Sequence, residues 1–217
     1  MTVTTFRPYA ARDADRCAAL AADVWPIVRA VVATEDLPRF MRLYIEVCQA
    51  AATRSEVACV DGQVAGFLLG RVSRDVTWRQ SVQMWWVLVK AGVKLFSGRY
   101  GRVKRPFEFA RCFLATEAKA QQLSAGSEAE VVLFVVGSQY QGLGLGRALL
   151  DRFVAAARQR GARLLTLYTD PLSNWRFYER YGFTRRATFV DDIDTYFRGE
   201  HTEGFVYELN LSAEASA

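Results

Sequence analysis

Three glycines fall within five positions of the stretch SQYQGLGLGRALL, residues 138–150, directly before a pattern typical of a helix. The first backbone amides of a helix have no internal hydrogen-bond partners and lie at the positive end of the helix dipole. Glycine lacks a Cβ atom and adopts positive φ easily, so a glycine turn can direct several amides at one anion. Gly142, Gly144 and Gly146 therefore predict a phosphate-binding turn, to which Arg147 adds a positive charge.

Two common phosphate-binding patterns do not fit this turn. A Walker loop ends in Gly-Lys-Ser/Thr, whereas Gly146 is followed by Arg147 and Ala148. A Rossmann fingerprint needs GxGxxG, and its third glycine would fall on Arg147 or Leu149. The pattern that fits is Gln/Arg-x-x-Gly-x-Gly/Ala, which begins at Gln141 and is spelled QGLGLG.

A second signature lies downstream, in NWRFYERYGF (174–183), where Asn174 precedes a Tyr-x-x-x-Gly-Phe pattern that begins at Tyr178. With the glycine turn, it resembles the GNAT superfamily of acyl-CoA-dependent N-acyltransferases. The predicted elements follow one another in the family's order: a strand, the glycine turn, a helix, a second strand, a short helix, and a Gly-Phe pair that opens a further strand. The match is specific over about 128–190, rests on element order alone over 1–72, and is absent over 74–127.

The resemblance implies a coenzyme A site. In the family, this turn binds the pyrophosphate and the preceding strand binds the pantetheine arm, so acetyl-CoA is the expected acyl-donor substrate and no metal is expected. Asn174 lies closer to the tyrosine than in the commoner family form, so it could contact the coenzyme or cap the helix. The implied coenzyme-binding residues are Phe134, Val135, Val136, Gln141, Gly142, Leu143, Gly144, Leu145, Gly146, Arg147, Asn174 and Tyr178.

Acyl transfer to an amine also needs acid–base chemistry, because the acceptor arrives as an ammonium ion with a pKa of about 10. A base must remove a proton, and the departing thiolate needs a proton donor. The resemblance implies Tyr178 as the donor and Glu130, in AEVVLF (129–134), as the base; a backbone amide near Val136 would stabilise the oxyanion. Glu128 or a chain of waters are alternative bases, and Tyr178 could also be a packing residue.

The elements around these residues predict the fold class. Apolar runs bounded by turn residues predict strands over 2–8, 56–72 (a hairpin), 130–136, 163–169, 183–190 and 203–211. Apolar residues at helical spacing predict helices over 13–25, 36–52, 144–160 and 172–181. The length fits one acetyltransferase domain over 1–217. We expect an α/β protein of the GNAT type, with a mixed, mostly antiparallel central sheet, a splayed parallel pair and helices on both faces.

A helical insertion over about 74–127 departs from the family pattern, with helices expected near 79–97 and 107–123. The first of them, WRQSVQMWWVLVKAGVKLF, carries three of the five tryptophans and apolar residues on nearly all sides, so something must cover it. The most apolar run in it, VQMWWVLVKAGVKLF (82–96), contains Lys90 and Lys94 and is too short and too charged to span a bilayer. The insertion could wall the acceptor site, form a homodimer contact, or lie on a membrane surface through the basic stretch SGRYGRVKRP (97–106).

Composition limits the remaining possibilities. The net charge is +5, which suits an anionic ligand but does not by itself indicate nucleic acid. The four cysteines are not spaced like a metal-binding motif or a CxxC redox pair, so free thiols are expected. The N-terminus lacks the apolar core of a signal peptide. Both observations favour a cytoplasmic protein. The only histidine, His201, lies in a polar loop. The acidic connection over 191–203, which begins with DDID, could attract a cationic amine or be an ordinary solvated loop.

These features together predict an N-acetyltransferase that moves an acetyl group from acetyl-CoA to a primary amine by direct transfer in a ternary complex. The expected partners are acetyl-CoA and the amine, without nucleic acid and without membrane contact. The alternative is an acyl-CoA-binding regulatory or interaction protein that retains the coenzyme site but has weak or no activity.

Overall fold

The central element of the computed structural model, which describes residues 3–97 and 103–212, is a seven-stranded sheet. Its strand order is β1-β2-β3-β4-β5-β7-β6, and every pair is antiparallel except β4–β5. The strands are β1 (Thr4–Pro8), β2 (Arg54–Val60), β3 (Gln63–Val72), β4 (Ala129–Val136), β5 (Leu164–Thr169), β6 (Thr184–Val190) and β7 (Glu203–Asn210).

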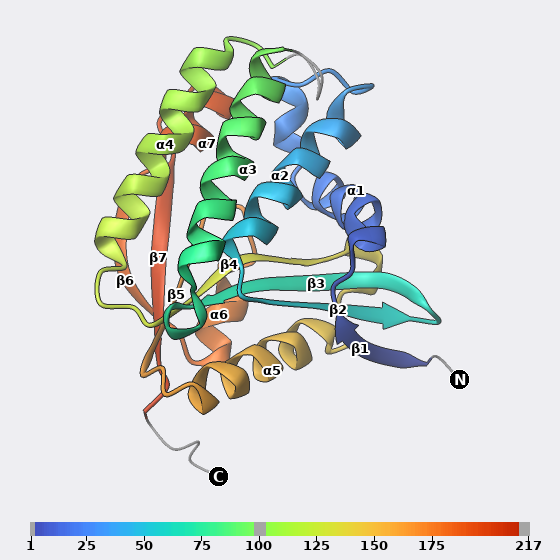
Figure 1. Ribbon diagram of the computed structural model, residues 1–217, viewed down its shortest axis with the longest axis vertical. Coiled ribbons are helices and arrows are strands. Elements are labelled where there is room, and N and C mark those ends of the chain that lie inside the picture. Colours follow the sequence, from blue (N-terminus) through green and yellow to red (C-terminus); the bar gives the residue numbers. More distant parts are fainter. Residues whose placement is uncertain (1–2, 98–102, 213–217) are drawn as a thin grey trace.

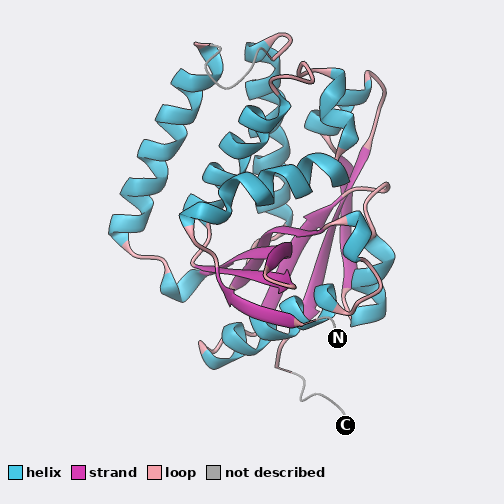
Figure 2. Cartoon of the chain, turned by 90° about the vertical axis from the view of Figure 1, so that its right-hand side faces the viewer, coloured by secondary structure: helices cyan, strands magenta, loops and turns pink. Residues whose placement is uncertain are grey.

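Helices lie on both faces of this sheet (Figures 1 and 2). They are α1 (Ala14–Val24), α2 (Leu37–Ala51), α3 (Trp78–Phe96), α4 (Pro106–Leu123), α5 (Leu145–Gln159), α6 (Trp175–Tyr181) and α7 (Asp192–Arg198), with a short 3₁₀ helix, η2 (Pro26–Ala30), after α1. One core cluster joins α1 and α2 to β2, β3 and β4, and a second joins α5 and α6 to the opposite face. The architecture confirms the expected mixed α/β fold.

A β-bulge in β4 sets the geometry of the sheet's centre. Leu69 of β3 pairs with Leu133, but the next residue, Gly70, pairs with Val131, so Val132 is an extra residue on β4. A bulge bends its strand and interrupts the regular alternation of side chains. Consistent with this, β4 is paired with β5 only over 129–131, and the two strands diverge beyond that point. The parallel pair is therefore splayed, as expected.

The insertion forms two long helices on the side of the sheet that α1 and α2 cover (Figure 1). Helix α3 packs on α2, and α4 packs on α7 and β6. None of the residues of α3 is buried, and its tryptophans Trp78, Trp85 and Trp86 are 72%, 58% and 52% exposed. Of the basic stretch between the helices, residues 98–102 lie outside the described residues. No helix in the described part of the chain is long and apolar enough to cross a bilayer.

The acidic connection between the last two strands contains a helix, α7, where the sequence predicts a loop. Asp191 is fully buried and caps α7, because its carboxylate accepts hydrogen bonds from the amides of Ile193 and Asp194 at 3.1 Å each. Acidic residues in the first turn and Arg198 in the last turn suit the helix dipole, and Gly199 ends the helix with φ +74°. This segment is therefore ordered by its carboxylates rather than solvated through them.

Candidate active site

A cavity of about 650 Å³ runs through the side of the molecule where β4 and β5 diverge. The volume is typical of sites for small molecules and cofactors. One end lies against the glycine turn, the N-terminus of α5 and α6, and the other end lies among α1, η2, α2, α4 and α7. We call that second end the aromatic chamber, after its side chains Trp25, Phe40, Tyr44, Phe109, Phe113 and Phe197.

The glycine turn has the geometry that its sequence predicts. Gly142 and Gly144 have φ of +81° and +75°, in the left-handed region that side chains rarely adopt, and a Cβ atom at either position would meet nothing within 4 Å. Gly144 is the N-cap of α5, and no described residue accepts a hydrogen bond from the backbone amides of residues 144–147. The turn therefore presents free amide donors and a helix N-terminus to the cavity.

Most of the residues expected to bind the coenzyme line this one cavity. The exception is Leu143, whose side chain is 56% exposed and lies outside the cavity. Asn174 lines the cavity and occupies the N-cap position of α6, but its side chain makes no capping hydrogen bond. The structure thus brings together Phe134, Val135, Val136, Gln141, Gly142, Gly144, Leu145, Gly146, Arg147, Asn174 and Tyr178.

Tyr178 lies on α6, where it combines cavity lining with packing. Its ring contacts those of Phe134, Phe183 and Tyr207, with centroids 6.4, 5.8 and 6.4 Å away. Burial raises the pKa of the Tyr178 hydroxyl well above its ordinary value, and the negative charge of Asp170 adds to the effect. The hydroxyl therefore stays protonated at neutral pH and can donate a proton or a hydrogen bond within the cavity.

The structure places the two expected bases outside the cavity. Glu130 lines a separate small pocket, where Arg71 of β3 donates a hydrogen bond to its carboxylate at 2.5 Å. Glu128 accepts a hydrogen bond from the backbone amide of Arg163 at 2.5 Å, which lowers the pKa of the Glu128 carboxyl. His201 is exposed and does not line the cavity either.

Four carboxylates do line the cavity: Asp170, Asp191, Asp194 and Glu117. Asp191 and Asp194 belong to the acidic connection over 191–203, which its charge marks in the sequence, whereas the sequence motifs do not identify Asp170 or Glu117. Glu117 lies in the insertion, outside any recognised motif, and no sequence signal distinguishes it from the other polar residues of α4. Within residues 3–97 and 103–212, no group of histidine, cysteine and carboxylate side chains is arranged to hold a metal ion.

Comparisons of sequence and structure agree on the family. The model of the acetyltransferase (GNAT) family matches residues 20–183. A mycothiol acetyltransferase of Geodermatophilus obscurus is 45% identical over 69 residues, which are 30% of this chain and 22% of that protein. The match therefore spans only about a fifth of that relative's length.

Several crystal structures share the fold. The ribosomal-protein-S18-alanine N-acetyltransferase from Escherichia coli aligns with a TM-score of 0.54 at 16% identity, over 99% of this chain and 97% of that one. SsHAT aligns at 0.58 and 20% identity, over 97% and 99%. Ard1 from Thermoplasma volcanium aligns at 0.52 and 17% identity, over 95% and 97%. With the family match over three quarters of the chain, these findings lead to one conclusion: the chain belongs to the GNAT family of acetyltransferases.

Proposed function

We propose that this protein transfers an acetyl group from acetyl-CoA to a primary amine, directly and with both substrates bound. One observation carries the proposal: a single cavity connects the glycine turn to the aromatic chamber through the gap between β4 and β5. A coenzyme bound at the turn and an acceptor bound in the chamber would meet in that gap. Holding two reactants in this way converts a bimolecular step into an effectively unimolecular one.

The turn is suited to the diphosphate of coenzyme A. Free amides at the N-terminus of α5 supply hydrogen bonds, and the side chains of Arg147 and Arg180 add positive charge from the cavity wall. Arg147 is held loosely, with its guanidinium 5.7 Å from the ring centroid of Tyr181 and 3.9 Å from Asp151. The expected role of this end of the cavity is to bind the donor and orient its thioester.

Tyr178 is the proposed proton donor for the departing thiolate. It lines the cavity at the mouth of the gap, and burial keeps its hydroxyl protonated. A phenol can match the basicity of a thiolate when both lie in the same desolvated site. Backbone amides of the splayed part of β4, near Val136, would face the oxyanion that forms when the amine attacks the carbonyl carbon.

Direct transfer is favoured over a covalent acyl-enzyme because no cysteine is among the described residues that line the cavity. Three of the four cysteines are buried in the core. Burial raises the pKa of the Cys17 and Cys48 thiols to about 12, so neither is a thiolate at neutral pH.

The test is thiol release from acetyl-CoA with a panel of primary amines, with coenzyme A binding measured in parallel by calorimetry. Amine-dependent thiol release together with the acetylated product would support the proposal. Tight coenzyme binding without turnover on any amine would instead favour an acyl-CoA-binding regulatory protein. Absence of coenzyme binding would contradict both.

A further inference from the structure

The inserted helix α4 presents one face to the cavity. Phe109, Phe113 and Glu117 are spaced four residues apart, so they lie on the same side of the helix, and all three line the cavity. The ring of Phe109 packs on Phe40 of α2, with centroids 5.6 Å apart, and on Phe197 of α7, at 6.2 Å. These contacts from two helices fix the rotation of α4, and with it the direction of Glu117.

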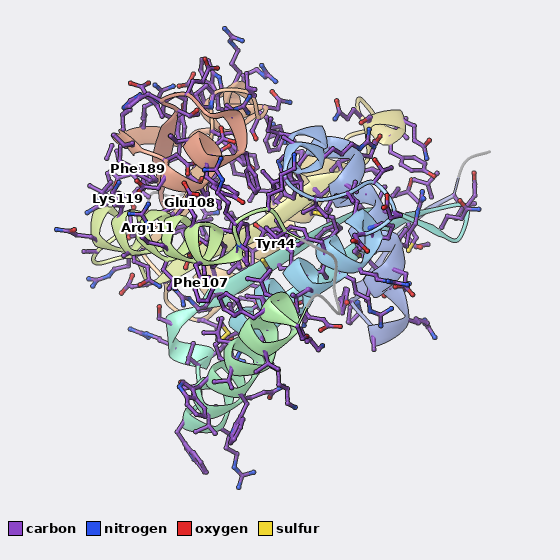
Figure 3. The ribbon with its side chains drawn as sticks, turned by 90° about the horizontal axis from the view of Figure 1, so that it is seen from above. Tyr44, Phe107, Glu108, Arg111, Lys119 and Phe189 are labelled. Atoms are coloured by element: carbon purple, nitrogen blue, oxygen red, sulfur yellow. The ribbon has the colours of Figure 1, made fainter. Side chains whose placement is uncertain are left out.

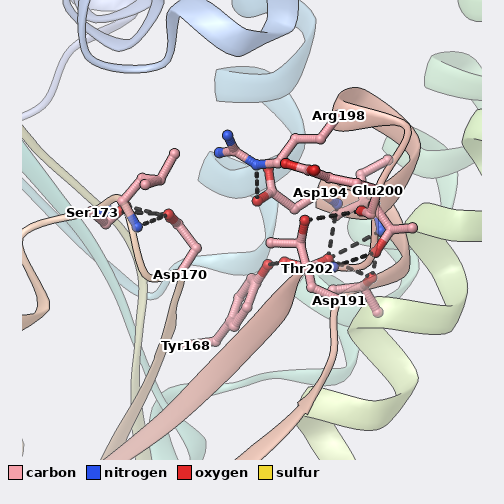
Figure 4. A network of polar contacts seen from close by, with 12 residues as sticks. Tyr168, Asp170, Ser173, Asp191, Asp194, Arg198, Glu200 and Thr202 are labelled. Atoms are coloured by element: carbon pink, nitrogen blue, oxygen red, sulfur yellow. Dashed lines mark hydrogen bonds and ion pairs between the residues drawn. The ribbon is translucent and has the colours of Figure 1, made fainter.

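Glu117 is the one cavity carboxylate that lacks a polar partner among the described residues. Asp191 accepts hydrogen bonds from Tyr168 and from Thr116, the latter at 3.0 Å, and Asp194 pairs with Arg198 at 2.7 Å (Figure 4). Asp170 accepts hydrogen bonds from the amides of Leu172 and Ser173 and from the Ser173 hydroxyl. Three of the four carboxylates therefore maintain the fold, and Glu117 remains available to a ligand.

The surroundings of Glu117 are apolar on the ligand side. Six aromatic side chains form the chamber, and Tyr44 of α2 lies between α2 and α4 in the view from above (Figure 3). The Glu117 side chain is exposed to the space of the cavity, which is partly open to solvent, and protein atoms lie close around its carboxyl group. A cation with an apolar body would match both the charge and the walls, since aromatic faces also attract cations.

The charged groups around Glu117 come from several elements. Burial raises the pKa of the Glu117 carboxyl to about 7, and the negative charges of Glu130 on β4 and Asp191 before α7 act in the same direction. Arg71 on β3 opposes them. Tyr44 and Cys48 of α2 also face Glu117, and both are neutral because burial raises their pKa values. A base with a pKa near neutrality is well suited to accept a proton from an amine.

Resting on the proposed function, we infer that the acceptor is a primary amine on an apolar or aromatic body, and that Glu117 binds its ammonium group and then accepts a proton from it. The inference rests on the juxtaposition of one unpartnered carboxylate with six aromatic side chains in the same cavity. Helix α4, which departs from the family pattern, thus supplies part of the wall of the acceptor pocket, through Phe109 and Phe113, and also its base.

The steps balance as follows. The ammonium group gives one proton to the Glu117 carboxylate, and the neutral nitrogen attacks the thioester carbon to form the C–N bond. As the C–S bond breaks, Tyr178 protonates the thiolate, and the second proton lost by the nitrogen restores Tyr178. Glu117 releases its proton to solvent, so the products are the amide, coenzyme A and one proton.

The test compares wild type with Glu117→Gln and, as a matched control on the same helix, Glu108→Gln, since Glu108 lies outside the cavity and pairs with Arg105. Wild type should acetylate 2-phenylethylamine with kcat/KM at least about tenfold above that for ethanolamine. Glu117→Gln should lower that kcat/KM by about 10²-fold or more and remove its rise with pH near neutrality. Glu108→Gln should change neither.

A binding measurement separates this inference from the proposed function. Calorimetry at pH 8 with coenzyme A present should give weaker binding of 2-phenylethylamine to Glu117→Gln than to wild type, and equal binding of the neutral 3-phenyl-1-propanol to both. That result would support the ammonium site even if no amine were acetylated. A lack of acetylation by itself would contradict only the proposed function. Three results would overturn the inference. The first is equal binding of 2-phenylethylamine to Glu117→Gln and wild type, and the second is faster acetylation of ethanolamine than of 2-phenylethylamine by wild type. The third is loss of the pH dependence of kcat/KM in Glu130→Gln rather than in Glu117→Gln.

Discussion

At the scale of single residues, the hydroxyl of Tyr178 can be tested without disturbing the packing of its ring. Tyr178→Phe keeps the contacts with Phe134 and Phe183 but removes the proposed proton donor. We expect kcat to fall by about 10²-fold, with little change in the KM for acetyl-CoA. Tyr181→Phe is the control on the same helix, because the Tyr181 hydroxyl donates to Asp151 and lies outside the cavity. Equal losses in both variants would argue against a chemical role for Tyr178.

Glu117 predicts a pH dependence of stability that needs no substrate. Burial raises its pKa from 4.5 to about 7, so the fold favours the protonated form. Its contribution to stability is fully present below pH 4.5 and is lost as the pH rises through 7. Glu117→Gln, which is always neutral, should therefore melt at a higher temperature than wild type at pH 8 and at nearly the same temperature at pH 4.5. A difference in melting temperature that does not vary with pH would contradict this.

The residues of the site were predictable from sequence to unequal degrees. The glycines and Tyr178 stand in local motifs whose spacing fixes their geometry, so sequence alone predicts them. Glu117 depends on how α4 packs against α2 and α7, which is a property of tertiary structure. For Glu130, its pairing with Arg71 likewise requires β3 and β4 in register.

At the scale of elements, the glycine turn can be tested with a matched pair of substitutions. Gly144→Ala and Gly62→Ala both place a side chain at positive φ, +75° and +80°, in open space. Each should lower the free energy of unfolding by about 1 kcal/mol. Only Gly144→Ala should weaken coenzyme A binding, by roughly tenfold or more if one charge-assisted hydrogen bond is lost. Calorimetry on both variants measures this, and equal affinities would place the coenzyme elsewhere.

The short helix α7 gives a second test at this scale. Asp191→Ala removes the cap of α7 and the acceptor for the protons of the Thr116 and Tyr168 hydroxyls, so the free energy of unfolding should fall by at least about 2 kcal/mol. Asp192→Ala removes only a half-exposed ion pair with Lys119 and should cost less than about 1 kcal/mol. Urea unfolding of the two variants compares them, and similar losses would contradict the structural role assigned to Asp191.

Sequence patterns predicted most of the elements, and the exceptions have physical causes. Helix α7 is two turns long, so its apolar periodicity is weak, although the Asp191 cap and Gly199 are recognisable start and stop signals. The bulge at Val132 cannot be seen in the strand's own sequence, because residues 131–136 are all apolar and show no polar–apolar alternation that an extra residue could disturb. Since the bulge accompanies the divergence of β4 from β5, the position of the cavity also required the structure.

At the scale of the whole molecule, the cavity contacts elements from both core clusters, so a ligand there should stabilise the fold as a unit. Coenzyme A at 100 times its dissociation constant contributes about 2.7 kcal/mol. For a chain of this size, that free energy corresponds to a rise in melting temperature of roughly 5–10 °C. Thermal unfolding with and without coenzyme A measures the shift, which should be smaller for Gly144→Ala at the same concentration. An unchanged wild-type melting temperature would contradict coenzyme binding.

The distribution of tryptophans has a practical consequence for such measurements. Three of the five indoles lie on the exposed surface of α3, whereas Trp25 lines the cavity and Trp175 lies beneath the guanidinium of Arg176. Four of the five tryptophans therefore lie outside the cavity. Replacing Trp78, Trp85 and Trp86 with phenylalanine would leave two indoles, of which Trp25 lies inside the acceptor chamber; the further change Trp175→Phe would make Trp25 a single optical reporter there.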